Sequence, residues 1–108
     1  MPGLSATKRS RNDSMLRRLE LAAPALKKTY GVQRIGMFGS FARGEQTKHS
    51  DVDILVEFVE GHASLHNLVY LADELEALFK RKVDLLTVGG IDKYLRPRIE
   101  TEVIWIEE

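Results

Sequence analysis

Cysteine, a surplus of charge of one sign and long hydrophobic runs are all missing from this sequence. Without cysteine the chain can form neither a disulfide nor a thiolate metal site, which suits the reducing cytoplasm, where we expect the protein to act. Lys plus Arg number 16 and Asp plus Glu number 16, so no bulk charge draws the chain to nucleic acid, and we do not expect direct nucleic-acid binding. No apolar run approaches the length of a membrane span, and no signal-peptide core is present.

The 108 residues are enough for one domain with a single core and too few for two. Residues 1–12 are polar and basic and contain the run KRSR, so we expect a flexible basic tail there, with a nucleic-acid arm as the alternative. Residues 13–108 are then expected to form the domain.

Hydrophobic spacing predicts an α/β (α+β) arrangement. A helix capped by Asp13 or Ser14 should run to about Tyr30, with a kink or break at Pro24, and an amphipathic helix should bury one face made by Leu65, Leu68, Val69, Ala72, Leu75 and Phe79. A short helix interrupted by Pro97 should precede the last strand. The predicted strands are residues 32–38, 51–58, 82–88 and 103–106.

The strand DVDILVEF places acidic residues inside an apolar run. Its side chains alternate, so Val52 and Ile54 face the core while Asp51 and Asp53 point together to the other face, about 6.5–7 Å apart along the chain. Two carboxylates this close repel each other unless a cation lies between them. We expect this face to be open to solvent or ligand. Asp84 in VDLL is a third acidic residue in an apolar strand, and three such carboxylates can hold two Mg²⁺ ions for phosphoryl or nucleotidyl transfer.

Gly39 and Ser40 directly follow a predicted strand. A tight turn there lets backbone N–H groups approach a phosphate, and Arg43, one turn on, can reach the same phosphates with its charged fork. Each of these residues also has an ordinary structural explanation. Gly39-Ser40 is a common turn and Arg43 a surface residue, while Asp51 can begin a strand and Asp84 can pair with Lys82 or Arg81. Their order and spacing together favour the functional interpretation.

The stretch GSFARGEQTKHSDVDILVEF resembles the nucleotidyltransferase superfamily of DNA polymerase beta. That motif is an apolar residue, Gly-Ser or Gly-Gly, a gap of about ten residues and Asp-apolar-Asp, with a third carboxylate on a later strand. More narrowly, the stretch is similar to the minimal nucleotidyltransferase (MNT) subfamily, as are KRKVDLLTV and LRPRIETEVIWI. The resemblance covers nearly the whole chain from about Ser14.

The resemblance implies a small mixed sheet of about four strands with helices mainly on one face, like the polymerase beta palm. It implies Asp51, Asp53 and Asp84 as catalytic carboxylates and metal ligands, and Gly39 and Ser40 as the triphosphate contact, with Arg43 as a weaker nucleotide-binding assignment. It also implies two Mg²⁺ ions, ATP as substrate, and a HEPN-domain ribonuclease toxin as the partner whose tyrosine receives AMP. The chain would then act as an antitoxin.

Two other functions stay open at this stage. The protein can neutralise its toxin mainly by binding it, or it can modify a small molecule such as an aminoglycoside. The core and carboxylate strands use almost the whole chain, which favours an acceptor presented by another macromolecule, in a hetero-oligomer with the toxin or with a homodimer completing the site. His62 and His66 are four residues apart, but without a third ligand we interpret them as surface residues. Tyr70, Tyr94 and Trp105 can belong to a partner surface, although burial is the default for Trp105 because it lies in a predicted strand.

Overall fold

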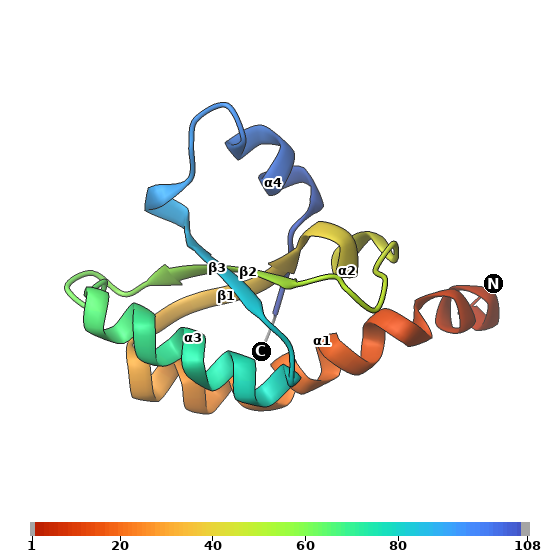
Figure 1. The fold of residues 1–108 in the computed structure, drawn as a ribbon, viewed down its shortest axis with the longest axis horizontal. Helices are drawn as coiled ribbons and strands as arrows, with labels where there is room; N and C mark the ends of the chain where they lie inside the picture. Colours follow the sequence, from red (N-terminus) through yellow and green to blue (C-terminus); the bar gives the residue numbers. More distant parts are fainter. Residues whose placement is uncertain (1, 107–108) are drawn as a thin grey trace.

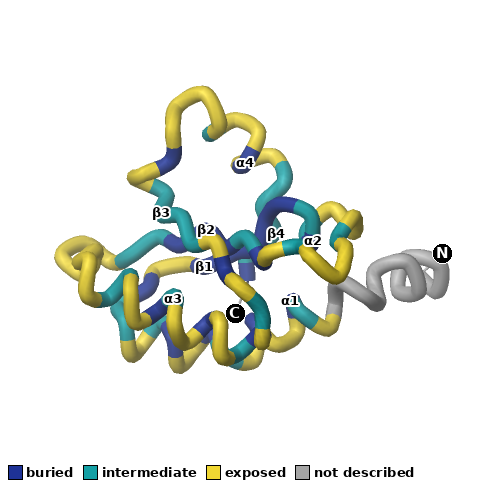
Figure 2. The backbone as a smooth tube through the Cα atoms, viewed as in Figure 1, coloured by how far each residue is buried: buried dark blue, intermediate teal, exposed yellow. Residues whose placement is uncertain are grey.

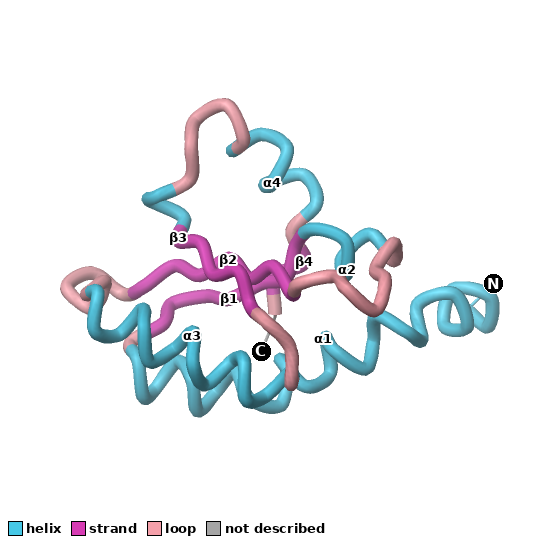
Figure 3. Tube along the Cα trace, in the orientation of Figure 1, coloured by secondary structure: helices cyan, strands magenta, loops and turns pink. Residues whose placement is uncertain are grey.

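The chain folds around one four-stranded sheet (Figures 1 and 3). In this computed structural model the described part of the chain is residues 2–106, with side chains described from residue 14 onward. The elements, in order, are α1 (Pro2–Tyr30), β1 (Val32–Phe38), α2 (Gly39–Arg43), β2 (Val52–Phe58), α3 (Leu65–Phe79), β3 (Val83–Thr87), the 3-10 turn η1 (Val88–Gly90), α4 (Arg96–Glu102) and β4 (Ile104–Trp105).

The sheet has the strand order β3-β2-β1-β4 and is mixed, which confirms the predicted fold class. β1 pairs antiparallel with β2 and with β4, whereas β2 and β3 run parallel. Parallel neighbours need a crossover connection, and α3 supplies it. All four predicted strands are present, each within one residue of its predicted ends.

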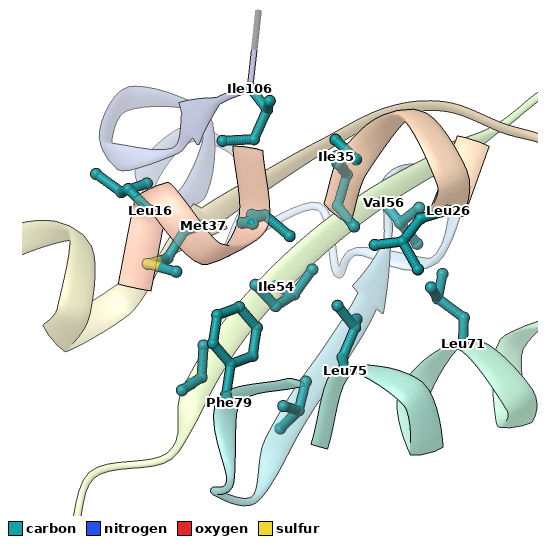
Figure 4. Close-up of a cluster of buried hydrophobic side chains, with 14 of the residues drawn as sticks. Leu16, Leu26, Ile35, Met37, Ile54, Val56, Leu71, Leu75, Phe79 and Ile106 are labelled. Carbon is teal, nitrogen blue, oxygen red and sulfur yellow. The ribbon is translucent and has the colours of Figure 1, made fainter. Parts of the chain in front are cut away.

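The main hydrophobic core lies between the sheet and the helices α1 and α3, which run beneath it in Figure 1. Figure 4 shows side chains from all these elements meeting there, including Leu26 of α1, Ile35 of β1, Ile54 of β2 and Leu75 of α3. Val52, Ile54 and Val56 are completely buried, as the alternation in β2 predicts. This packing fixes β2 in the centre of the sheet, where Figure 2 shows much of the buried backbone.

The opposite face of the sheet is partly covered, which corrects the expectation that the Asp51/Asp53 face is open. Leu55 lies on that face and is 1% exposed, because a second cluster packs over it from η1, α4 and β4. A cavity of about 210 Å³ lies under this cover, and it is lined by Arg34, Leu55, Val88, Ile91, Glu100 and Trp105. The cover does not close over the aspartates, since Asp51 and Asp84 are exposed and Asp53 is half-buried.

The two prolines inside predicted helices do not break them. α1 runs through Pro24, whose missing N–H leaves the carbonyl of Glu20 free; both residues are exposed, so water can satisfy that carbonyl. Pro97 lies in the first turn of α4, where a helix needs no donor, so the predicted interruption is wrong.

The first helix begins at Pro2 rather than at the predicted Asp13 or Ser14. The sequence has no glycine or proline between residues 4 and 23, so no helix-breaking residue interrupts this stretch. The predicted flexibility of residues 1–12 concerns side chains outside the described part and stays a prediction.

The buried face of α3 differs from the predicted one. Leu71, Leu75 and Phe79 are buried, while Leu65 is 76% and Val69 50% exposed. At about 100° per residue, Val69 lies roughly 120° round the helix from Leu75, which turns it away from the sheet. The helix begins at the predicted place because Ser64 accepts a hydrogen bond from the N–H of Asn67. Among the described residues, no helix is long and apolar enough to cross a membrane.

Candidate active site

The turn from β1 into α2 brings the backbone against an aspartate. Gly39 has φ +75°, a left-handed conformation that favours glycine. A Cβ at this position would collide with the carboxylate of Asp53, which belongs to the neighbouring strand β2. Phe38, the last residue of β1, is the register partner of Asp53, so the strand pairing itself places the turn beside the carboxylate. Only glycine allows this close approach.

α2 is a five-residue helix that begins at Gly39 and ends at Gly44, which has φ +74° and donates its N–H to the carbonyl of Ser40. This confirms the predicted single turn and its end at Gly44. The hydroxyl of Ser40 makes no hydrogen bond within the described part of the chain, and the residue is half-buried. Ser40 therefore offers a donor and an acceptor to a ligand at this turn.

Asp53 and Asp84 lie level with each other on adjacent parallel strands. Strands in a sheet are about 4.8 Å apart, and side chains of directly paired residues point to the same face. Asp84 is exposed, and within the described residues it forms no salt bridge. The sequence could not show that β2 and β3 are neighbours, so this pairing is what brings the third carboxylate to the first two.

Asp51 is exposed and lies immediately before β2; the predicted strand includes it, whereas the observed strand begins one residue later, at Val52. Two contacts fix the chain leading to it: Thr47 N–H donates to Ser50 Oγ at 2.8 Å, and Ser50 N–H donates to the carbonyl of Thr47 at 3.1 Å. Arg81 Nη1 donates to the carbonyls of Ser50, at 2.6 Å, and Lys48, at 3.3 Å. Arg81 therefore holds the loop before Asp51 and is not paired with Asp84.

The electrostatics of the site concentrate on Asp53. Its pKa is raised from the ordinary 3.8 to about 6, first by desolvation and then by the negative charges of Asp84 and Asp51. Arg43 lowers this pKa and Glu102 raises it further. Three carboxylates therefore interact at one place, which is the arrangement that a hard cation relieves.

Glu102, at the end of α4, is a site residue that sequence reasoning missed. Its Oε1 accepts the N–H of Gly39 at 3.0 Å, and Arg43 Nη1 lies 3.3 Å from Oε1 and 3.1 Å from Oε2. The Nε of Arg43 is bound to Glu45 Oε1 at 2.9 Å. These acidic partners raise the pKa of Arg43. The contacts join α4 to the β1–α2 turn over 63 residues of sequence, and no local pattern signals them.

The donor set of the site fits a hard divalent cation. Asp51, Asp53 and Asp84 offer oxygen ligands, and the pKa of Asp53 is raised by desolvation first and by the charges of the other two carboxylates second. Among the described residues, no three His, Asp or Glu side chains are already arranged to hold a metal ion. Two of the three histidines make other contacts: His62 packs on Gly31, and the rings of His66 and Tyr70 are 4.5 Å apart.

Comparison with known proteins finds similar sequences in archaea. A family model described as nucleotidyltransferase domain matches residues 19–106. A Methanocaldococcus jannaschii protein, named provisionally as a protein adenylyltransferase, is 49% identical over 75 residues, covering 69% of this chain and 80% of that protein. The protein adenylyltransferase MntA of Thermococcus cleftensis is 40% identical over 81 residues, covering 75% of this chain and 81% of MntA.

Solved structures share the fold. One, provisionally described as a minimal nucleotidyltransferase, matches with a TM-score of 0.66 and 35% identity over 91% of both chains. A second contains the tri-AMPylated HEPN toxin of Shewanella oneidensis in complex with its MNT antitoxin. It matches with a TM-score of 0.63 and 20% identity, over 86% of this chain and 71% of that one. At that identity the second likeness concerns the fold alone.

Proposed function

The chain belongs to the nucleotidyltransferase domain family and is a nucleotidyltransferase; we propose that it transfers AMP from ATP to a tyrosine hydroxyl of a HEPN ribonuclease toxin and so acts as an antitoxin in the cytoplasm. The observation that carries this proposal is the pair Asp53 and Asp84, level on adjacent strands, with the Gly39 turn held against Asp53. A triphosphate bound at the turn would have its reacting phosphorus close to these carboxylates.

Some of the site residues would bind the metal and the others would bind the nucleotide. Asp51 and Asp53 would hold Mg²⁺ between them, with Asp84 completing the ligand set. When bound, the cation would offset the carboxylate repulsion and the charge that develops on the α-phosphate and the leaving pyrophosphate. Ser40 would donate its hydroxyl to the triphosphate, and Arg43 would supply a positive charge beside it.

In the transfer step the tyrosine oxygen forms a bond to the α-phosphorus while the bond from that phosphorus to the bridging oxygen breaks, and pyrophosphate leaves. The tyrosine hydroxyl must lose its proton. Asp84 is exposed and level with Asp53, so it can accept this proton directly or through a water molecule. The rigid strands β2 and β3 would hold the attacking group and the phosphate in line.

The choice of a protein acceptor rests on the relatives. MntA and the Methanocaldococcus protein are both named for adenylyl transfer to protein, at 40% and 49% identity. The choice of a HEPN toxin rests on the Shewanella complex, whose toxin carries AMP and whose partner shares this fold. Together these support AMPylation of a toxin protein over modification of a small molecule, while the choice of a tyrosine rests on the family resemblance of the sequence.

Direct binding without transfer is the second candidate, and one surface favours it. Leu65, Val69 and Tyr70, in the first two turns of α3, are 76%, 50% and 51% exposed. Exposed apolar side chains that gather in one place are typical of protein contact sites. A toxin bound at this surface could be neutralised by coverage alone.

One experiment separates the two candidates. The protein is incubated with α-labelled ATP, Mg²⁺ and the product of the neighbouring gene as the proposed toxin, and wild type is compared with Asp51→Asn/Asp53→Asn. Transfer of label and toxin neutralisation by wild type alone support the enzyme. Neutralisation by both proteins, with no transfer of label, would refute the catalytic account and support direct binding.

A further inference from the structure

The side chain of Glu102 connects the turn at Gly39 with Arg43, and the proposed function places the triphosphate at this turn and beside this arginine. It is 17% exposed, far less than Glu45, the other acidic partner of Arg43, which is 67% exposed. One of its oxygens takes the N–H of Gly39 and both lie within reach of Arg43. Charge-assisted hydrogen bonds that are shielded from water hold their geometry better than exposed ones.

The guanidinium of Arg43 is fixed on two of its nitrogens and available on the third. Glu45 engages Nε and Glu102 engages Nη1, while Nη2 has no partner in the described part of the chain. Because the guanidinium is planar, two fixed nitrogens determine the direction of the third. Arg43 can therefore offer Nη2 to a phosphate without breaking either contact.

Glu102 also fixes the glycine turn. The N–H of Gly39 donates to Glu102 and is therefore not available to a phosphate. Gly39 contributes instead by having no side chain, which lets the turn pass close to the carboxylate of Asp53. The same carboxylate thus sets the positions of the turn and of Arg43 relative to each other.

We propose that Glu102 is a positioning residue for nucleotide binding, and that by holding Arg43 and the Gly39 turn it sets the affinity of the site for the triphosphate of a nucleoside triphosphate. This proposal rests on the proposed function, because it takes the turn and Arg43 as the triphosphate site. In the opposite role, Glu102 would be an internal anion that competes with the triphosphate, and its removal would then strengthen ATP binding. The direction of the change in ATP affinity therefore decides between the two roles.

The test is isothermal titration of ATP with Mg²⁺ into wild type, Glu102→Gln, Glu102→Ala, Arg43→Ala and the Glu102→Ala/Arg43→Ala double variant. We expect about tenfold weaker binding for Glu102→Ala, equal to about 1.4 kcal/mol. The double variant should lose less affinity than the two single changes added together, because Glu102 acts in part through Arg43. The matched control is Glu100→Gln on the same helix, whose carboxylate lies 3.9 Å from Arg96; it should change affinity less than twofold.

A second measurement follows Arg43 without any nucleotide. In ¹⁵N NMR spectra the Arg43 Nη1 protons, which Glu102 accepts, should exchange with water more slowly in wild type than in Glu102→Gln, which keeps the size of the side chain and removes its charge. With toxin present, the Glu102 variants should raise KM for ATP while kcat at saturating ATP changes little. A purely structural role would instead lower kcat and the melting temperature together.

Three results would overturn the proposal: unchanged or tighter ATP binding in Glu102→Ala, additive effects in the double variant, or an Arg43 signal insensitive to Glu102→Gln. Tighter binding would establish the competing-anion role. If wild type itself binds no ATP, the proposed function fails, and the NMR comparison still tells whether Glu102 holds Arg43.

Discussion

Replacing Asp53 with asparagine should make the protein more stable at neutral pH while removing its activity. The pKa of Asp53 is raised from 3.8 to about 6, so the folded chain holds this proton more readily than the unfolded chain does. The contribution of Asp53 to stability is therefore fully present below about pH 4 and is lost as the pH rises through about 6. Asparagine has no charge to bury and escapes this loss.

The size of the effect follows from the pKa and the exposure. A rise from 3.8 to about 6 corresponds to about 3 kcal/mol at 1.36 kcal/mol per pH unit. Asp53 is half-buried, and solvent screening reduces this figure, so we expect Asp53→Asn to gain about 1–2 kcal/mol at pH 8 and about 0 at pH 4.

The assay is urea unfolding of wild type and Asp53→Asn at pH values from 4 to 8, with EDTA present and without nucleotide. Asp73→Asn, an exposed change on α3, is the matched control and should show no such dependence on pH. Two results would refute the claim that the charge of Asp53 destabilises the fold. One is an Asp53→Asn variant that is less stable than wild type at pH 8. The other is a difference in free energy of unfolding, between variant and wild type, that stays the same from pH 4 to pH 7.

Three further predictions concern the turn, the core and the loop. Gly39→Ala should lose AMP transfer and cost at least about 1–2 kcal/mol in free energy of unfolding, because alanine at φ +75° is strained and its Cβ meets Asp53; a fully active variant would contradict the close approach. Leu75→Ala should cost about 3–5 kcal/mol in urea unfolding and Leu65→Ala less than about 0.5, since the first side chain is completely buried and the second is 76% exposed. Arg81→Gln should speed hydrogen exchange in residues 44–51 and raise KM for ATP, and unchanged exchange would argue against its hold on that loop.

The sequence alone predicts the parts of this molecule that depend on local pattern. The alternation in DVDILVEF separates the buried Val52 and Ile54 from the carboxylates on the other face, and the structure has this separation. The positions of β1 and of the turn at Gly39 follow in the same way. The family resemblance adds the mixed sheet, which the strand pairing confirms.

Features that depend on long-range packing could not be predicted. The cover over Leu55 comes from residues of η1, α4 and β4, although Leu55 and Leu86, two positions after Asp53 and Asp84 and so on the same face, were a signal that this face is partly buried. Glu102 reaches the turn because of the way α4 docks, and nothing within its own seven-residue helix indicates the contact. The exposure of Leu65 and Val69 depends on how α3 is rotated against the sheet.

Intact mass spectrometry of the toxin is the most direct test of the central claim. The product of the neighbouring gene, the proposed toxin, is incubated with ATP, Mg²⁺ and either wild type or Asp53→Asn, and any modified peptide is then sequenced. The account predicts mass increments of whole AMP groups on a tyrosine with wild type and none with the variant. An unmodified toxin that is nonetheless neutralised, or equal modification by both proteins, would contradict it.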